Sequence, residues 1–384
     1  MATERMTFDR RNTTAFGRWW WTVDRPTLFA LMILVFLGVF MVVAASPAVA
    51  NRIGLDDFYF VTRHEIFLVL AVAAMLFISA LPTRQIRRLA ALGFAISFVL
   101  LVLLPIIGYE NKGAVRWIRF AGMSVQPSEF LKPCFAVMAA WVFSERFRNQ
   151  QFPSYRIAFA MYAMVVMLLV IQPDFGMVVT VTGMFGIQFF LAGMPFVWVI
   201  GLMFMGISGA IAAYQFMPHV TSRIDRFLNP ASGDNYQVGK SIEAFQSGGW
   251  IGRGPGEGVV KQHIPDSHTD FIFAVAGEEF GVLFCLVVIG IFAFIVIRGY
   301  SRLWKEQDMF TLIAVAGLLA QFGIQAIVNM GVAVNLLPAK GMTLPFLSYG
   351  GSSLVAMALG MGMMLALRRK RYGQFKVDLR RRVV

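Results

Sequence analysis

The sequence predicts an all-α integral membrane protein with ten transmembrane helices, and three observations support this fold class. Of the 384 residues, 58% are hydrophobic and only 14% are charged, against about 25% in globular proteins. Apolar runs of membrane-spanning length recur along the chain. The basic residues gather in short clusters between these runs. The net charge of +13 therefore indicates membrane topology rather than nucleic-acid binding.

Ten apolar runs are long enough to cross about 30 Å of hydrocarbon as helices. They divide the chain into an arm (1–26), a membrane domain (27–367) and a basic tail (368–384). An even number of crossings places both termini on one side of the membrane. The predicted helices cover residues 27–48, 65–81, 89–107, 130–147, 156–172, 176–192, 196–216, 271–298, 309–331 and 353–367.

The distribution of basic residues decides which side that is. The arm, the tail and the loops 82–88, 144–156 and 298–308 contain 22 of the 34 lysines and arginines. Cytoplasmic loops carry this excess in membrane proteins, so both termini are predicted to be cytoplasmic. We expect the arm and the tail to contact anionic membrane lipids, with docking of a protein partner as the alternative.

Unusual sequence accumulates in the loops that this topology places outside. A large periplasmic loop, 217–268, joins helices 7 and 8, and the segments 109–129 and 332–352 are rich in Gly, Pro and polar residues. Residues 340–353 are too apolar for a free loop and too broken for a helix, which favours a re-entrant segment packed on protein. The chemistry of the protein is therefore expected on its outer side.

Several kinds of site are excluded or disfavoured. Cys134 and Cys285 both lie in apolar runs, so no disulfide framework or CxxC metal site is predicted. The four histidines are scattered, which argues against zinc. The glycine-rich run 252–258 lacks the Gly-Lys-Ser/Thr of a P-loop, so a turn is favoured over a nucleotide cradle.

Charged residues within the predicted spans point to function or to ion pairing. Glu129 and Lys132 lie three residues apart on one helix face and can pair. The pair is either structural, or Lys132 contacts an anionic head group while Glu129 orients it. Glu278 and Glu279 lie about 12 Å along a helix from Asp270. Two such carboxylates cannot both be bare ions, so a structural network and a proton relay remain open.

Asp270 lies in His268-Thr269-Asp270-Phe271, where the eighth span begins at its outer end. A carboxylate at this position can cap the helix and meet its positive dipole. It can equally serve as a general base at the water–lipid boundary, beside a polar cavity. Both interpretations fit the spacing.

Several segments form one ordered pattern along the chain: 113–118 with 126–130, 172–176, 247–250, 268–273 with 277–279, and 337–353. Taken together and in order, they resemble the motifs of the SEDS family (shape, elongation, division and sporulation) of bacterial cell-wall proteins. The loop from Lys340 to Pro345 is more similar to the cell-division branch than to the rod-elongation branch. Asp266 stands where the family commonly has Glu, which leaves the charge unchanged.

The resemblance implies a peptidoglycan glycosyltransferase that polymerises lipid II into β-1,4 glycan strands at the division septum. It implies a class B penicillin-binding protein and other divisome proteins as partners, in the bacterial cytoplasmic membrane. Asp270 would be the catalytic carboxylate, taking a proton from the acceptor hydroxyl during an inverting displacement of polyprenyl diphosphate.

The diphosphate leaving group requires positive charge. The cations available on the outer side are Arg116, Lys132, Lys340 and Lys261. A divalent cation, Mg²⁺ or Mn²⁺, could share this task, although no motif specifies a metal site. The family motifs add His268, Thr269 and Ser348 as substrate contacts, and the supporting residues would be Glu129, Asp174, Glu278 and Glu279.

Two other functions fit part of the same pattern. In a flippase that moves lipid II outward, the charged residues within the spans would form a polar path across the bilayer. In a non-catalytic scaffold, spans eight and nine would hold a synthase at the septum. The large outer loop, without a comparable inner vestibule, favours the polymerase over the flippase.

Overall fold

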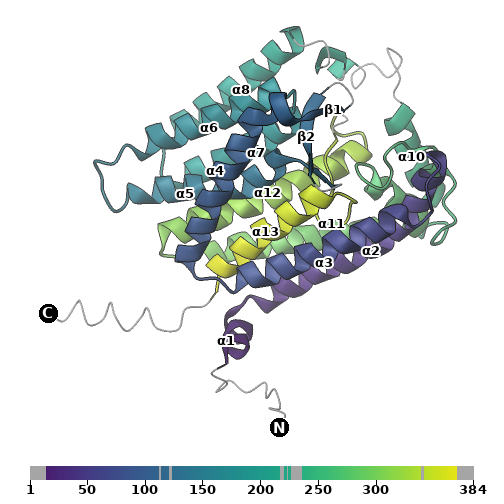
Figure 1. The fold of residues 1–384 in the computed structure, drawn as a ribbon, viewed down its shortest axis with the longest axis horizontal. Coiled ribbons are helices and arrows are strands. Elements are labelled where there is room, and N and C mark those ends of the chain that lie inside the picture. Colours follow the sequence, from purple (N-terminus) through teal and green to yellow (C-terminus); the bar gives the residue numbers. More distant parts are fainter. Residues whose placement is uncertain are drawn as a thin grey trace.

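The structure is a computed structural model of the chain. It describes residues 14–111, 114–120, 123–216, 220–222, 224–225, 236–338 and 341–369. Half of the predicted arm, most of the predicted tail, Gly113, part of the 217–268 loop and Lys340 lie outside these ranges. The described chain is mostly helical, and long helices run side by side with a few short strands at one end (Figure 1).

Each of the ten predicted ranges coincides with a helix in the described chain, within a few residues at most ends. Six of these helices, α2, α3, α4, α6, α11 and α12, are long and apolar enough to cross a membrane. The helices are α2 (Arg25–Arg52), α3 (Tyr59–Ser79), α4 (Thr83–Ile107), α5 (Pro127–Glu145), α6 (Ser154–Ile171), α7 (Phe175–Leu191), α8 (Phe196–Phe216), α11 (Ile272–Leu303), α12 (Met309–Ala333) and α13 (Gly351–Leu367).

The helices differ in how much apolar surface they leave uncovered. The apolar stretch of α12 is 78% buried inside the protein, whereas that of α4 is only 22% buried. Ile106 on α4 is 80% exposed, and Val69 on α3 is 71% exposed. Such large uncovered apolar faces are unfavourable in water, and in a bilayer they would contact lipid. The helix α12 therefore forms the centre of the bundle.

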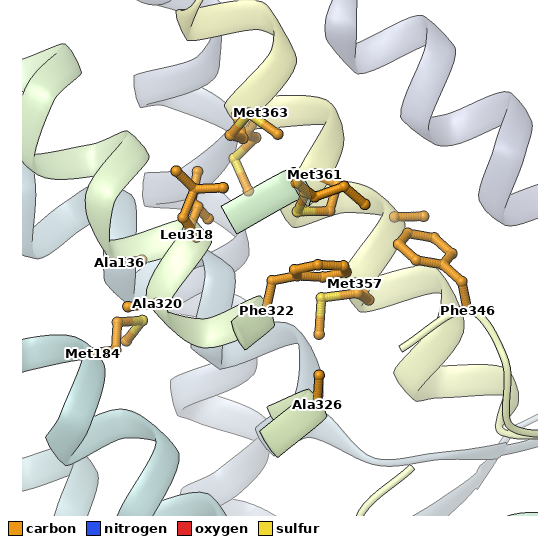
Figure 2. Close-up of a cluster of buried hydrophobic side chains, with 14 of the residues drawn as sticks. Ala136, Met184, Leu318, Ala320, Phe322, Ala326, Phe346, Met357, Met361 and Met363 are labelled. Carbon is orange, nitrogen blue, oxygen red and sulfur yellow. The ribbon is translucent and has the colours of Figure 1, made fainter. Parts of the chain in front are cut away.

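The core around α12 combines large and small apolar side chains. Figure 2 shows Phe322 of α12 beside Met357 and Met361 of α13. The small residues Ala320 and Ala326 lie on α12 near Phe322. Small residues let helices approach closely in membranes. Flexible methionine side chains fill the irregular gaps that remain.

The described chain also contains elements that were not anticipated. Among them are the short helix α1 (Ala15–Thr22) before the first span, a sheet of β1 (Tyr109–Asn111), β2 (Ala114–Phe120) and β3 (Met123–Val125), the helix α10 (Tyr236–Gly248) and a 3-10 turn (Val260–His263). The sheet is antiparallel in the order β1-β2-β3. It lies in the predicted outer segment 109–129, and α10 lies in the predicted 217–268 loop.

The helix α11 is broken at Gly281, which has a left-handed backbone (φ 81°). The segment 249–254 lies against the break and takes over the hydrogen bonds that a continuous helix would make there. An added Cβ at Gly281 would come within 2.4 Å of the Trp250 carbonyl oxygen, so glycine permits this approach. The backbone amides of Val282, Leu283, Arg253 and Gly254 donate to the carbonyls of Gly249, Trp250, Glu278 and Glu279, respectively.

Candidate functional site

Asp270 lies in a tight turn just before α11, and its side chain is partly exposed. Its backbone amide donates to the carbonyl of Asp266, which adopts a left-handed conformation (φ 55°). The loop between α12 and α13 lies directly against the carboxylate, because a Cβ added at Gly341 would be 3.1 Å from Asp270 Oδ2. A partly solvated carboxylate is thus placed beside that loop.

The capping interpretation of Asp270 is wrong. The helix α11 begins at Ile272, and Phe271 occupies the N-cap position without a side-chain cap. Asp270 precedes the N-cap, so its carboxylate is not used to satisfy the first amides of the helix. This removes the structural explanation that the sequence alone had left open.

Two amide side chains of α12 connect the parts of the site. Asn329 Nδ2 donates to the carbonyl oxygens of Asp270 (2.9 Å) and Met342 (2.6 Å). One turn earlier, Gln325 Nε2 donates to the carbonyl of Thr343 (3.1 Å), and its Oε1 accepts from Lys132 Nζ (3.0 Å). Consecutive residues of the α12–α13 loop are therefore held by one helix face that also holds Asp270 and Lys132.

Asn329 is expected to act as a positioning residue for Asp270. Replacing it with Ala leaves two buried carbonyls without their donor, which costs about 1–3 kcal/mol, and it releases the loop from Asp270. We expect kcat for the glycan synthesis that the resemblance implies to fall about tenfold, with KM changed less. Steady-state kinetics of the purified protein would measure this split.

The matched control for this prediction is Gln321→Ala. Gln321 is also buried on α12, and its amide atoms have no hydrogen-bond partner among the described residues. This variant should keep kcat within about twofold of wild type. Equal losses in the two variants would contradict a positioning role for Asn329.

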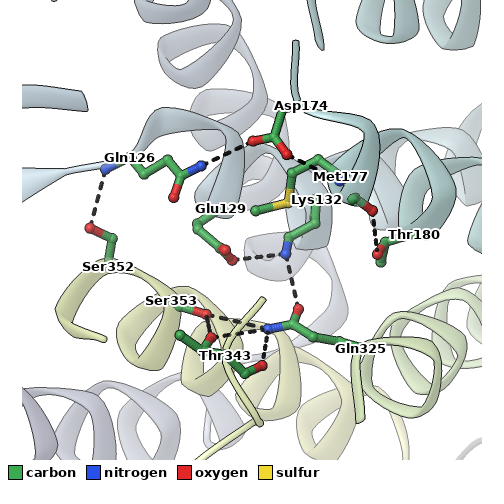
Figure 3. Close-up of polar contacts among 11 residues, drawn as sticks. Gln126, Glu129, Lys132, Asp174, Met177, Thr180, Gln325, Thr343, Ser352 and Ser353 are labelled. Carbon is green, nitrogen blue, oxygen red and sulfur yellow. Dashed lines mark hydrogen bonds and ion pairs between the residues drawn. The ribbon is translucent and has the colours of Figure 1, made fainter. Parts of the chain in front are cut away.

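The predicted Glu129–Lys132 pair is confirmed, with Lys132 Nζ 2.8 Å from Glu129 Oε2. Lys132 is 1% exposed and Glu129 is 5% exposed. Figure 3 shows the pair between α5 and α12, with Gln325 reaching on to Thr343 and Ser353. An ammonium group has three donors, so one donor of Lys132 remains beyond Glu129 and Gln325.

Arg116 and Asp174 meet near the turn between α6 and α7. Arg116, on β2, donates to the carbonyls of Gln172 (3.0 Å) and Pro173 (2.6 Å). Asp174 accepts from the backbone amide of Met177 at the start of α7 and from Gln126 Nε2 (3.2 Å). Burial raises the pKa of Asp174, and the nearby Arg116 charge opposes this. These contacts fix the sheet on the helical bundle.

Glu278 and Glu279 belong to a network that holds the outer loop in the break of α11. Glu278 accepts the backbone amides of Val259, Val260 and Lys261 at 2.7–2.8 Å. Glu279 forms an ion pair with Lys261 Nζ. Hydrogen bonds thus satisfy Glu278, and Lys261 neutralises Glu279 through Oε1, although Glu279 Oε2 has no hydrogen-bond partner among the described residues. Paired carboxylates of this kind support the structural interpretation over a proton relay.

Lys261 uses all three of its donors within this network. Its ammonium group also donates to the carbonyls of Ala44 (2.9 Å) and Gly256 (3.4 Å), and the residue is 6% exposed. The geometry therefore favours a role in joining the loop to α2 and α11 over a role as a phosphate ligand.

The three remaining motif residues shape the turns around Asp270. His268 is 5% exposed and packs against Phe60 and Tyr349, with ring centroids 4.5 and 5.1 Å away. Burial lowers the pKa of His268 to about 4, so its ring is neutral near pH 7. Thr269 Oγ1 donates to the carbonyl of Asp266. Ser348 is buried, and its Oγ accepts the amide of Leu344 (2.8 Å).

Gln325 and Asn329 were not among the site residues predicted from the sequence. Three amide side chains at four-residue spacing in a largely apolar span, Gln321, Gln325 and Asn329, were the available signal, because polar groups inside membranes form hydrogen bonds to other helices. The structure brings together Asp270, Lys132 and Glu129 through the last two of these amides. Gly341 lies beside the Asp270 carboxylate. Lys340, which precedes Gly341 in the sequence, lies outside the described residues.

A sequence model of the "Cell cycle protein" family, which groups FtsW, RodA and SpoVE, matches residues 25–373. The chain belongs to the SEDS family. A Caulobacter vibrioides protein named "Probable peptidoglycan glycosyltransferase FtsW" is 46% identical over 96% of this chain and 95% of its own length. A protein of the same name from Geobacter metallireducens is 36% identical over 89% and 94%.

Solved structures of SEDS proteins have the same fold. One, described as "Structural coordination of polymerization and crosslinking by a peptidoglycan synthase complex", has a TM-score of 0.76 at 27% identity and covers 92% of this chain and 99% of its own. An Asp-to-Ala variant of the rod shape determining protein RodA from Thermus thermophilus has a TM-score of 0.67 at 25% identity, with the same coverage. The relatives named FtsW support the resemblance to the division branch, and this SEDS chain is a multi-pass membrane protein.

Proposed function

We propose that this protein is a peptidoglycan glycosyltransferase that polymerises lipid II at the outer face of the cytoplasmic membrane during cell division. The observation that carries the proposal is the placement of Asp270. It is a partly exposed carboxylate that does not cap its helix, and it lies against the loop that follows α12. Homologues named peptidoglycan glycosyltransferase support the same activity.

In the proposed reaction, the acceptor's 4-hydroxyl oxygen attacks the anomeric carbon of the donor sugar. The new C1–O4 bond forms as the bond to the diphosphate oxygen breaks, which inverts an α-linked donor into a β-1,4 product. Asp270 takes the hydroxyl proton, as a general base within hydrogen-bond reach can. Polyprenyl diphosphate departs with the bonding electrons.

Positive charge stabilises the developing diphosphate, and we assign this role to Lys340 and Lys132. Arg116, on β2, is the third candidate cation. Lys132 keeps one donor beyond its described contacts. In the part of the chain that the structure describes, no three His, Cys, Asp or Glu side chains form a metal site. A Mg²⁺ or Mn²⁺ ion would instead take most of its ligands from phosphate and water, as Mg²⁺ does in other phosphate sites.

The proposed topology has ten spans, cytoplasmic termini and a periplasmic 217–268 loop, with the protein at the septum. Its partners would be a class B penicillin-binding protein and other divisome proteins. The clustered basic residues support the orientation. The similarity to a chain of a peptidoglycan synthase complex supports the transpeptidase partner.

Reconstitution in liposomes tests the proposal against its two rivals. The purified protein, with and without its penicillin-binding partner, is supplied with lipid II on one side of the bilayer. Glycan chains that require this protein support the polymerase. Translocation without polymerisation would identify a flippase, and the absence of both activities would leave a scaffold.

Lys340→Ala is expected to weaken the use of the lipid-linked donor more than Glu257→Ala does. Loss of one cation beside a diphosphate removes a charge-assisted contact worth about 1.5–3 kcal/mol, which raises KM about tenfold or more. Glu257 is exposed in the glycine-rich run and serves as the control. Initial rates against lipid II concentration measure the difference, and equal effects would discard Lys340 as a phosphate ligand.

A further inference from the structure

A cluster of arginines surrounds one buried carboxylate at the end of the bundle opposite the proposed active site. Asp24, just before α2, has a side chain that is 1% exposed. It forms ion pairs with Arg298 (3.1 Å) and Arg302 (3.0 Å) of α11 and with Arg368 (3.0 Å) at the end of α13. Thr27 donates a hydrogen bond to the same carboxylate (2.6 Å). We call Asp24 and these three arginines the Asp24 cluster.

The Asp24 carboxylate is ionised at neutral pH. Burial disfavours its charge, but the hydrogen bonds from Thr27 and Arg298 and the charges of Arg368 and Arg302 outweigh this and lower its pKa. Guanidinium groups keep their charge. The cluster therefore holds three positive charges against one negative charge.

The surplus charge is not balanced by other described residues. Within the described chain, each arginine of the cluster is ion-paired with Asp24 and with no second carboxylate. The C-terminal ends of α11 and α13 offset about half a charge each, while the N-terminal end of α2 adds about half a positive charge. More than one positive charge therefore remains to attract an anion.

Two arginines of the cluster can reach such an anion. The side chain of Arg302 is 44% exposed and that of Arg298 is 24% exposed, whereas Arg368 is almost fully buried. Arg298 Nε is buried and has no hydrogen-bond partner among the described residues. Planar guanidinium groups match the oxygens of a phosphate.

Aromatic residues place the cluster at the depth of lipid head groups. Trp304, two residues after Arg302, is 91% exposed. Trp20 and Trp21 of α1 stack with Arg25, whose Cζ lies 4.8 Å from the Trp21 ring centroid. Tryptophans concentrate at the membrane–water interface, and the leaflet on the cytoplasmic side is rich in anionic lipids.

We propose that the Asp24 cluster binds the phosphate of an anionic phospholipid in the cytoplasmic leaflet. Arg302 and Arg298 would contact the head group, and Arg368 would hold Asp24 in place. The bound lipid would neutralise the surplus charge where α2, α11 and α13 meet.

The test is native mass spectrometry of the detergent-purified full chain titrated with phosphatidylglycerol. We expect wild type to retain this lipid in preference to phosphatidylcholine. Removing one arginine near an anionic lipid removes about 1 kcal/mol of attraction, which corresponds to about fivefold weaker binding. Arg302→Gln should show this loss. Arg298→Gln is a second variant with the same expectation, and each variant leaves Asp24 two arginine partners.

The matched control is Arg148→Gln, which removes one charge from a loop with the same predicted orientation. Arg148 is 71% exposed and pairs only with Glu145 among the described residues, so lipid binding should be unchanged. Equal losses in Arg148→Gln and Arg302→Gln, or equal retention of phosphatidylcholine by wild type, would overturn the proposal. Displacement of phosphatidylglycerol by millimolar inorganic phosphate would identify a site for free anions instead.

Discussion

Asp270→Asn abolishes glycan polymerisation and leaves the fold intact: this is the largest effect we expect from a single substitution. The side chain is partly exposed, Phe271 and not Asp270 is the N-cap of α11, and asparagine has the same size and shape as aspartate, so the fold should be kept. An amide cannot accept the proton from the acceptor hydroxyl. General-base catalysis contributes about 10²–10⁴-fold, so kcat should fall by that factor while KM changes little.

The measurement is lipid II polymerisation by the purified protein with its partner, followed by separation of the glycan chains by length. Asp266→Asn is the matched control, because it makes the same chemical change in the same turn. Asp266 has a left-handed backbone, which asparagine also tolerates, so activity should stay within about threefold. Full activity of Asp270→Asn would exclude this carboxylate as the base.

Breaking the Glu129–Lys132 pair should have the second-largest effect, this time on stability as well as on activity. Lys132→Met leaves the buried Glu129 carboxylate without its counter-ion, and removing one partner of a buried pair costs about 3–5 kcal/mol. The double variant Glu129→Leu/Lys132→Met removes both charges together. Its stability should be close to that of wild type, since apolar replacements of buried pairs are often neutral or stabilising.

The double variant separates structure from catalysis. If Lys132 stabilises the diphosphate, the double variant folds normally but loses polymerase activity. Thermal midpoints in detergent report on the first property, and lipid II turnover reports on the second. Lys240→Met breaks an exposed i,i+3 pair with Glu243 and should leave the thermal midpoint almost unchanged, because exposed pairs contribute little. A double variant with full activity would leave the pair with a structural role only.

The positions of the long helices and the Glu129–Lys132 pair could be predicted because both depend on local spacing. A helix that crosses lipid needs a continuous apolar run, and residues three apart on a helix are neighbours whatever the rest of the fold does. The helices coincide with all ten predicted ranges for this reason.

Contacts between distant segments could not be predicted in this way. The insertion of residues 249–254 beside Gly281 depends on backbone groups, which carry no side-chain signal. Lys261 looked like an available outer cation, but Glu279 and two carbonyls surround it in the structure. The start of α11 at Ile272 could not be predicted to the residue either, because an apolar run does not mark the exact end of a helix. This start leaves Asp270 one residue before the N-cap.

The interruption of α11 has a mechanical consequence. Helical hydrogen bonds normally make a transmembrane segment behave as one stiff rod, but this rod is divided at residue 281, and residues 249–254 are bonded to the piece before the break and to the piece after it. Asp270 directly precedes the first piece. A displacement of residues 249–254 would therefore reach the acid through the first piece and the rest of the bundle through the second.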